Sequence, residues 1–172
     1  MKTIGVISDT HGTLDEPFIR FLEPCDEIWH AGDIGSGHVA DLLEKTGRLR
    51  AVYGNIDDQQ IRSRFPAVQL FMCEEMKVMI VHIGGYPPRY NRQILPLLNT
   101  EKPGILVTGH SHILKVQYDR KHRLMYINPG AAGRSGFHRK RTAVRFGLDR
   151  EGLHNMEVLE TERASGNRTE NQ

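Results

Sequence analysis

Cysteine is scarce in this chain of 172 residues, which contains only Cys25 and Cys73. The two lie far apart and outside any CxxC pattern, so buried free thiols in a reducing cytoplasm are the favoured interpretation. Long apolar runs are also missing, since none approaches the ~18 residues that a membrane span needs. The N-terminus lacks the apolar length and the cleavage site of a signal peptide. We therefore expect a cytoplasmic protein without a membrane partner.

Charge of a single sign is lacking too. The 23 Lys and Arg residues nearly balance the 21 Asp and Glu residues, and the net charge is +2 with neutral histidines. Bulk charge therefore does not indicate a polyanion-binding protein. The length suits one domain with a substantial core, which we expect over residues 1–160. Residues 161–172 are polar and without apolar periodicity, and we expect this tail to be disordered.

Glycine and histidine are plentiful, with 17 and 9 residues, and the first third of the chain alternates between strand and helix patterns. Short β-branched runs predict strands, and apolar residues at helical spacing predict helices between them. This βαβαβ order favours parallel strands joined by crossover helices. The strands are expected at residues 2–8, 26–32 and 48–55, and the helices at 13–23, with Thr13 as a cap, and at 36–47, between Ser36 as a cap and Gly47 as the stop.

The pattern changes in the second half of the chain. It predicts a short helix or loop at 57–65, a hairpin at 67–85 that turns at Glu74 and Glu75, and a helix at 90–104 interrupted by Pro96. The remaining segments predict strands at 105–110, 113–119, 123–130, 141–149 and 153–160. We expect this half to be mostly antiparallel, and two packed sheets with helices outside them form the natural architecture.

Side chains with metal-binding chemistry recur where the expected strands end. They are Asp9 and His11, Asp33, Asn55, His82, and His110 with His112. In open α/β sheets, ligands bind at the carboxyl ends of strands, and neighbouring glycines let the backbone turn sharply there. Taken singly, each of these residues more often serves a turn, a helix cap or a hydrogen-bonded core. Five strand ends that all carry such residues are hard to explain by capping alone.

These side chains exceed the about four to six ligands that one transition-metal ion takes, and they fit two ions that share a bridging carboxylate. The mixture of imidazole and carboxylate favours manganese, iron or zinc over calcium. Two ions ~3.5–4 Å apart are suited to the hydrolysis of phosphoesters. His30 is expected in the core and not among the ligands, and His38, on a helix, is left unassigned.

The same residues lie in motifs that resemble those of the calcineurin-like metallophosphoesterases, and most closely those of their small single-domain bacterial and archaeal phosphodiesterase branch. The matching segments follow the family's order: SDTHG at 8–12, HAGDI at 30–34, GNID at 54–57, VHIGG at 81–85, GHSH at 109–112 and INPGA at 127–131. The resemblance implies an α/β fold, a four-layer α-β-β-α sandwich of two mixed β-sheets flanked by helices. It also implies a binuclear centre, with Asp9, His11 and His112 at one ion, Asn55, His82 and His110 at the other, and Asp33 as the bridge.

The activity that this resemblance implies is hydrolysis of phosphate esters by a metal-activated hydroxide, with Asp33, Asn55 and His82 assigned to catalysis. We expect two divalent ions, manganese first, with zinc, iron, nickel and magnesium as alternatives. Many members of the wider family have a histidine after the motif asparagine, a candidate general acid, but here Ile56 follows and cannot donate a proton. We therefore expect phosphodiesters to react better than simple alkyl monoesters. Asp57 is expected to cap the following helix.

The segment after INPGA supplies further candidates, because Arg134 and Asn128 could hold the substrate phosphate. The alternative for this basic segment, residues 133–145, is a solvated loop and strand edge. Two other functions stay open: a non-catalytic scaffold, since the retromer scaffold subunit resembles this branch, and a nuclease, which only the basic segment supports. We expect a small phosphate ester as the partner, rank nucleic acid below it, and leave a homo-oligomer open.

Overall fold

The computed structural model describes residues 1–163 of the chain. In chain order its elements are β1 (Lys2–Ile7), α1 (Glu16–Leu22), β2 (Glu27–His30), α2 (Gly37–Thr46), β3 (Arg48–Ala51), α3 (Gln59–Arg64), β4 (Val68–Cys73), β5 (Met76–Val81), β6 (Gly85–Tyr86), β7 (Arg89–Tyr90), α4 (Leu95–Glu101), β8 (Ile105–Val107), β9 (Leu114–Asp119), β10 (Leu124–Pro129), β11 (Lys140–Asp149) and β12 (Gly152–Glu162). Most expected elements are present at their predicted places.

Two five-stranded sheets form the centre of the molecule. The first sheet has the order β12-β11-β1-β2-β3 and the second has the order β4-β5-β8-β10-β9. The strands β1, β2 and β3 are parallel, and so are β5, β8 and β10. The pairs β1-β11, β11-β12, β4-β5 and β9-β10 are antiparallel. The expectation of a mostly antiparallel second half is therefore wrong for β5, β8 and β10. The crossover through α4 returns the chain so that β8 runs parallel to β5.

Side-chain alternation along the strands produces an apolar layer on each face of each sheet. Ile4 of β1 and Ile105 of β8 pack together in the layer between the two sheets. On the opposite face of β1, Ile7 packs in the helix-facing layer with Phe18 of α1. Leu106 of β8 likewise turns outward to the layer beneath α4. Central strands that are apolar on both faces are what a sheet buried on both sides requires.

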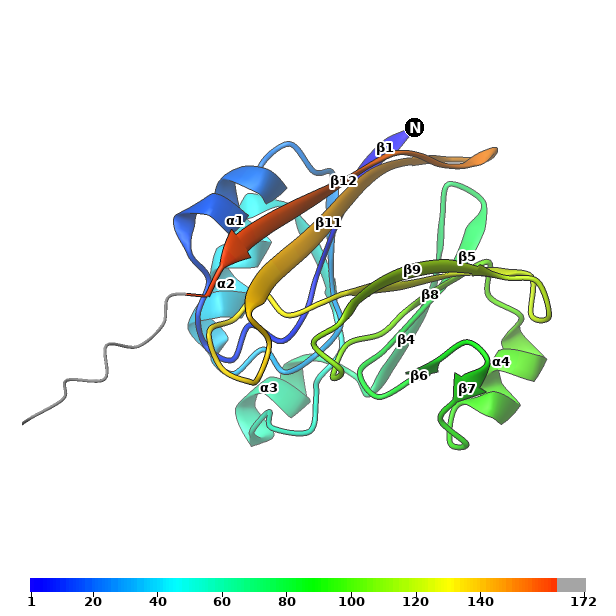
Figure 1. Cartoon of the computed structure of the whole chain (residues 1–172), viewed down its shortest axis with the longest axis horizontal. Helices are drawn as coiled ribbons and strands as arrows, with labels where there is room; N and C mark the ends of the chain where they lie inside the picture. Colours follow the sequence, from blue (N-terminus) through cyan, green and yellow to red (C-terminus); the bar gives the residue numbers. More distant parts are fainter. Residues whose placement is uncertain (164–172) are drawn as a thin grey trace, which may run out of the picture.

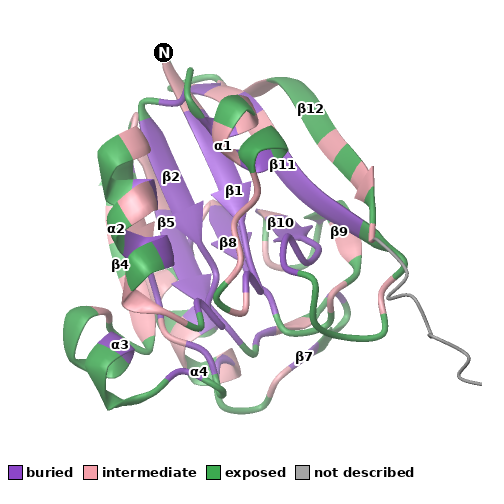
Figure 2. Ribbon diagram, turned by 90° about the vertical axis from the view of Figure 1, so that its left-hand side faces the viewer, coloured by how far each residue is buried: buried purple, intermediate pink, exposed green. Residues whose placement is uncertain are grey.

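These layers complete a four-layer arrangement. The helices α1 and α2 cover the outer face of the first sheet, and α4 covers the outer face of the second (Figure 1). The strand β2 is buried along its length and β1 and β11 are mostly buried, while β12 forms a largely exposed edge (Figure 2). The predicted α-β-β-α sandwich of two mixed sheets flanked by helices is confirmed.

Helix starts differ from the predictions where proline is involved. The helix α1 begins at Glu16 with Asp15 in the cap position, so the prediction of Thr13 as the cap is wrong. Pro96 lies in the first turn of α4 and does not interrupt a longer helix. Proline is favoured at such positions because the first N–H groups of a helix have no intrahelical partner. Residues 90–94, which were expected to be helical, precede α4 instead.

Other local predictions are confirmed. The Ser36 hydroxyl accepts a hydrogen bond from the Val39 backbone N–H, and Gly47 ends α2. Glu74 and Glu75 both have positive φ, 47° and 67°, in the hairpin turn between β4 and β5. Two consecutive left-handed residues match the twist of a two-residue hairpin loop.

The C-terminal edge extends slightly beyond the expected domain boundary. The strand β12 continues through Glu162, which pairs with Lys140, so the domain does not end at residue 160. The rest of the predicted tail, residues 164–172, lies outside the described residues. Cys25 and Cys73 are buried free thiols. Within residues 1–163, no helix has both the length and the apolar character needed to cross a membrane.

Candidate metal centre

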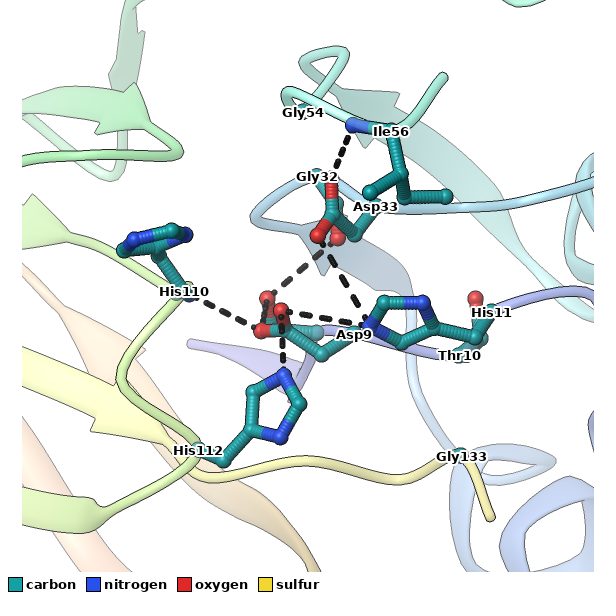
Figure 3. A network of polar contacts seen from close by, with 12 residues as sticks. Asp9, Thr10, His11, Gly32, Asp33, Gly54, Ile56, His110, His112 and Gly133 are labelled. Carbon is teal, nitrogen blue, oxygen red and sulfur yellow. Dashed lines mark hydrogen bonds and ion pairs between the residues drawn. The ribbon is translucent and has the colours of Figure 1, made fainter. Parts of the chain in front are cut away.

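Five strand ends bring the predicted ligands together between the two sheets. The first sheet contributes residues that follow β1, β2 and β3, and the second contributes residues that follow β5 and β8. Because these strands are parallel within each sheet, their carboxyl ends share an edge. Figure 3 shows Asp9, His11, Asp33, His110 and His112 converging from these ends.

The first group, the Asp9 cluster, consists of Asp9, His11 and His112. Their ligand atoms all lie within 4.8 Å of one another. The Oδ1 atom of Asp9 is 3.1 Å from Nε2 of His112 and 3.8 Å from Nε2 of His11. Asp9 is fully buried, while the two rings are partly buried. This is the ligand set that the family resemblance implies for one ion.

The second group, the Asp33 cluster, consists of Asp33, His82 and His110, with ligand atoms again within 4.8 Å of one another. Oδ2 of Asp33 is 3.3 Å from Nε2 of His82 and 3.7 Å from Nε2 of His11, so Asp33 also reaches the Asp9 cluster. The side-chain oxygen of Asn55 lies 3.0 Å from Nε2 of His82 and 3.1 Å from Nδ1 of His110. The structure thus brings together all seven predicted ligands, and Asp33 lies between the two groups.

Two buried ligand atoms, Oδ1 of Asp9 and Nε2 of His11, have no hydrogen-bond partner among the described residues. Leaving such an atom buried and unpaired costs about 1–3 kcal/mol. The neighbouring atoms of the cluster are themselves electron-pair donors, so their mutual approach is favourable when a proton or a metal cation lies between them. An oxygen and two imidazole nitrogens facing one space fit a divalent transition metal.

Hydrogen bonds outside the clusters fix which ligand atom faces inward. Nδ1 of His82 donates to the carbonyl oxygen of Ala31 at 2.7 Å, which leaves Nε2 free. Oδ2 of Asp9 accepts from the Ser8 hydroxyl at 2.6 Å and from the backbone N–H of His110 at 3.0 Å, which leaves Oδ1 free. Metal-binding imidazoles and carboxylates are characteristically oriented by such partners.

The backbone at the ligands is strained. Five of the seven ligand positions have φ between 47° and 69°, in the left-handed region: Asp9, His11, Asp33, His110 and His112. This conformation costs of order 1 kcal/mol or more for a residue with a β-carbon, and it accumulates where function requires a particular side-chain direction. The concentration of strain at these positions is independent support for a functional site.

Neighbouring glycines provide the space for close packing. A β-carbon at Gly54 would lie 2.0 Å from Oδ1 of Asp33, and one at Gly109 would lie 2.8 Å from Oδ2 of Asp9. Both distances are below any real contact of a β-carbon, so larger residues would displace the carboxylates. The glycine-rich motifs therefore serve the position of the ligands and not only the turns.

The charges in the two clusters stabilise one another. Burial raises the pKa of Asp9, but its contacts with His112 and His82 lower it by more, so the net pKa lies below the ordinary value. Burial also raises the pKa of Asp33, but contacts with His82, the Ile56 backbone N–H and His11 together lower it by more. Burial lowers the pKa of His82, yet Asp33 and Asp9 shift it above the ordinary value. The carboxylates are thus held in the ionised form that a cation requires.

His30 is a core residue, as expected, and lies directly beneath the site. Its Nε2 donates to the Thr10 hydroxyl at 2.9 Å, because that hydroxyl itself donates to the carbonyl of Ile34. Its Nδ1 accepts from the backbone N–H of Gly32 at 3.1 Å. Complete burial lowers the pKa of His30 to about 4. The neutral ring therefore supports both ligand loops.

The prediction that Asp57 caps the next helix is wrong, because the helix begins one residue later than that role requires. Asp58 is the cap of α3 and accepts from the backbone N–H of Ile61 at 3.0 Å. The buried carboxylate of Asp57 instead accepts three backbone hydrogen bonds, from Ile34, Gly35 and Gly54. Asp57 therefore ties the end of β2 to the end of β3, where Asp33 and Asn55 lie.

Both residues predicted to bind substrate are engaged within the protein. Arg134 pairs with Asp15 at 3.0 Å. Asn128 is buried, and its amide donates to the carbonyl of Gly109 at 2.9 Å and to the Ser111 hydroxyl at 3.1 Å. Asn128 thereby holds the turn that carries His110 and His112. Direct contact of either residue with substrate stays a prediction.

Sequence reasoning missed the position of His138, which it treated only as part of the basic segment. Nδ1 of His138 lies 3.1 Å from Nδ1 of His112, and its Nε2 donates to the carbonyl of Gly133 at 3.0 Å. The available signal was a further histidine close behind INPGA, a motif shared with the family. His38 lies exposed on α2, outside both clusters.

A four-layer sandwich with adjoining carboxylate–imidazole clusters at its strand ends defines a class of metal-dependent phosphoesterases. The chain belongs to the calcineurin-like phosphoesterase superfamily, whose domain matches residues 1–151. The resemblance identified in the motifs is thereby confirmed. Membership supports a hydrolase of phosphoester bonds that uses divalent metal ions.

Two curated archaeal relatives agree with this. A "probable metallophosphoesterase" of Methanocaldococcus jannaschii is 31% identical over 134 residues, covering 74% of this chain and 67% of that protein. A second, of Methanothermobacter thermautotrophicus, is 31% identical over 134 residues, covering 74% of this chain and 76% of that protein.

Solved structures match over nearly the whole length. Entamoeba histolytica Vps29 in complex with Zn²⁺ aligns with a TM-score of 0.72 and 17% identity, covering 93% of this chain and 98% of that one. An archaeal phosphodiesterase aligns with a TM-score of 0.72 and 20% identity, covering 91% and 99%. At these identities the likeness shows the fold alone.

Proposed function

We propose that this chain is a cytoplasmic phosphodiesterase that hydrolyses small phosphate esters at a binuclear metal centre. The observation that carries the proposal is the position of Asp33, whose carboxylate lies within 3.3 Å of His82 and 3.7 Å of His11. One carboxylate that reaches both clusters is what two adjacent ions need as a bridge. The solved archaeal phosphodiesterase and the Zn²⁺ complex of Vps29 support the choice of reaction and of cofactor class.

The residues of the chain would hold one ion with Asp9, His11 and His112 and the other with Asn55, His82 and His110. Divalent ions there would lower the pKa of water and place positive charge beside the phosphoryl oxygens. The protein orients the ligands before substrate arrives, since His82 and Asp9 are already fixed by Ala31 and Ser8. Manganese is the first choice because the ligands mix imidazole with carboxylate.

The site is poorly equipped to protonate the leaving oxygen of the substrate. Ile56 follows Asn55, is 48% exposed, and offers no proton. Its backbone N–H donates to Oδ1 of Asp33 at 3.1 Å, so even this donor is committed to the site itself. Esters whose leaving group departs without a proton are therefore favoured. This is the basis for preferring activated diesters to alkyl monoesters.

A nuclease is less well supported by the geometry. The basic segment that suggested it is largely neutralised: Arg134 and Arg141 pair with Asp15, Lys140 pairs with Glu160, and Arg145 pairs with Glu157. Cations already paired with carboxylates release fewer counterions from a polyanion. A scaffold role stays the second candidate, because a Vps29 of the same fold also binds Zn²⁺. Hydrolysis is preferred because all seven ligand positions hold competent side chains.

The test is steady-state hydrolysis by protein reconstituted with Mn²⁺. We expect chromogenic diesters, such as bis(4-nitrophenyl) phosphate, to have a higher kcat/KM than the corresponding monoester and than alkyl monoesters. Asp33→Ala serves as the control that separates hydrolysis by this site from contaminating activity. Monoester turnover equal to or above diester turnover contradicts the preference, and hydrolysis that survives Asp33→Ala contradicts the site.

A further inference from the structure

A cavity of about 360 Å³ adjoins the Asp33 cluster. Two of the proposed metal ligands, Asn55 and His82, form part of its wall. The rest of the wall comes chiefly from the segments around α3, β4, the end of β5 and the start of α4: Tyr53, Arg62, Ala67, Val68, Ile83 and Ile94. We call this cavity the side pocket. Its volume suits one small organic group.

The side pocket presents a flat and mostly apolar surface. Arg62 is the only acidic or basic residue in its wall, within the part of the chain that the structure describes, apart from the ligand His82. The Arg62 guanidinium donates to the carbonyl oxygens of Asp57 at 2.7 Å and Asn55 at 3.2 Å, and it lies 4.6 Å from the centre of the Tyr53 ring. Its charge is therefore largely committed, and the stacked pair forms a planar surface suited to an aromatic ring.

The side pocket adjoins the metal centre, because Asn55 and His82 both line the pocket and their side chains, 3.0 Å apart, both belong to the proposed ligands. A phosphoryl group held at the Asp33 cluster would place one of its substituents at the pocket entrance. We propose that the side pocket binds a planar aromatic substituent of the phosphoester, either an aryl group or a nucleobase. This inference rests on the proposed phosphoesterase function.

Competitive inhibition of the Mn²⁺-loaded protein tests this with ligands that carry a single substituent. Phenylphosphonate is compared with methylphosphonate for an aryl occupant, and thymidine 5′-monophosphate with ribose 5-phosphate for a nucleobase. Stacking of one ring predicts an inhibition constant about tenfold lower for the aromatic member of at least one pair. The pair that shows the preference identifies the source of the ring.

The matched variants are Ala67→Trp, which fills the rim of the side pocket, and Leu70→Trp, at an exposed position on β4 outside it. Ala67→Trp should remove the aromatic preference while leaving the inhibition constants of methylphosphonate and ribose 5-phosphate within about twofold. Leu70→Trp should leave all four constants unchanged. Equal inhibition within both pairs, or a preference that survives Ala67→Trp, overturns the proposal.

Failure of this inference is distinguishable from failure of the proposed function. If the metal-loaded protein hydrolyses no phosphoester, the proposed function is wrong, and the same four ligands are then titrated by calorimetry. A tenfold preference for an aromatic member that disappears in Ala67→Trp still supports the side pocket. Hydrolysis of diesters without any aromatic preference leaves the function standing and overturns the side pocket.

A different observation, the contact between two histidine rings beside the Asp9 cluster, carries a second inference. Nε2 of His138 donates to the carbonyl of Gly133, so in the neutral ring Nδ1 of His138 is an acceptor. It lies 3.1 Å from Nδ1 of His112 and accepts the proton there. With a metal ion bound, the remaining nitrogen of His112, Nε2, then presents a lone pair on the side of Oδ1 of Asp9, which lies 3.1 Å away.

The loop is shaped for this contact. Gly136 has φ of 123°, and a β-carbon there would lie 2.4 Å from Nδ1 of His112 and 3.0 Å from Nδ1 of His138. Only glycine leaves the two rings free to meet. We infer that His138 is a positioning residue, which selects the tautomer of His112 that can bind a metal ion.

Calorimetric titration of the metal-free protein with Mn²⁺ tests this in His138→Leu and His138→Asn. Loss of a hydrogen-bonding partner of a metal ligand predicts about 10- to 100-fold weaker binding at one of the two sites in His138→Leu. The amide oxygen of asparagine can accept from His112, so His138→Asn should recover a measurable part of the affinity. His38→Leu, on the exposed face of α2, is the control and should bind Mn²⁺ as the unaltered protein does.

A structural role of His138 alone would lower the thermal midpoint equally in both variants and would not be rescued by asparagine. Unchanged Mn²⁺ affinity in His138→Leu overturns the inference, and so does equal weakening in the leucine and asparagine variants. Equal weakening at both metal sites also counts against it, because among residues 1–163 His138 contacts a member of the Asp9 cluster and none of the Asp33 cluster.

Discussion

The two clusters of the metal centre have similar ligands and different surroundings. In the Asp9 cluster, Ser8 and a backbone N–H donate hydrogen bonds to the carboxylate, and His138 contacts the ring of His112. The Asp33 cluster contains the exposed ring of His110 and borders the side pocket. If the site acts as proposed, this difference places the substrate on the side of the Asp33 cluster.

The largest effect is expected from the residue that belongs to both halves. Asp33→Ala removes the shared carboxylate, so binding of both Mn²⁺ ions should weaken and kcat/KM for a diester should fall by about 10³-fold or more. Asp9→Ala should weaken mainly the site of the Asp9 cluster. Elemental analysis after gel filtration counts the bound ions in each variant. Retention of two tightly bound ions in Asp33→Ala would show that the clusters are independent.

The next effect concerns His30, which supports both clusters from below. Its pKa is lowered from 6.5 to about 4 by burial, so the unfolded chain binds a proton more readily than the folded one. Stability should therefore be unaffected by His30 above pH 6.5 and decline as the pH falls toward 4. The decline amounts to about 1.4 kcal/mol per pH unit, reaching about 3 kcal/mol.

Urea unfolding of the metal-free protein across this pH range measures that decline. The variant His30→Gln keeps an amide donor for Thr10. Its free energy of unfolding should fall by about 3 kcal/mol less than that of the unaltered protein between pH 6.5 and 4. If the free energies of unfolding of the two proteins changed in parallel with pH, His30 would be excluded as the titrating group.

The tie between the strand ends is tested by two adjacent aspartates. Asp57→Ala leaves three backbone N–H groups, two of them in buried hydrogen bonds, without their acceptor and should lower the free energy of unfolding by about 2–3 kcal/mol. Asp58→Ala removes only the cap of α3 and should cost about 1 kcal/mol. Chemical denaturation of both variants gives the comparison. Equal costs would mean that Asp57 acts only locally.

The smallest effect on metal binding is expected from glycine-to-alanine substitutions that place a β-carbon against one carboxylate. Gly54→Ala pushes a β-carbon against Asp33 and should weaken Mn²⁺ binding at the Asp33 cluster by about 10-fold or somewhat more. Gly109→Ala should do the same at the Asp9 cluster. The control is Gly37→Ala, where the nearest atoms are 3.6 Å away. Isothermal titration with Mn²⁺ reports both sites, and an unchanged affinity in Gly54→Ala would show that Asp33 relaxes freely.

The ligands were predictable because their signals are local. Asp9, Asp33 and His82 each lie within three residues of the end of a strand, and nearby glycines mark the turns. Two of the wrong predictions concerned helix caps, and they depended on shifts of one or two residues. Asp57 and Asp58 are equally good caps by type, and only the start of α3 decides between them. Thr13 and Asp15 pose the same choice before α1.

The amino-acid sequence alone determined the family, the two-sheet architecture and the seven candidate ligands, since strand patterns and turn motifs are carried by neighbouring residues. Only the tertiary structure decided the contact of His138 with His112, the pairing of Arg134 with Asp15, and the side pocket beside the Asp33 cluster. These features join segments from different sheets or distant loops. Their geometry depends on how the two sheets stack and where each loop returns, which residue spacing along the chain does not encode.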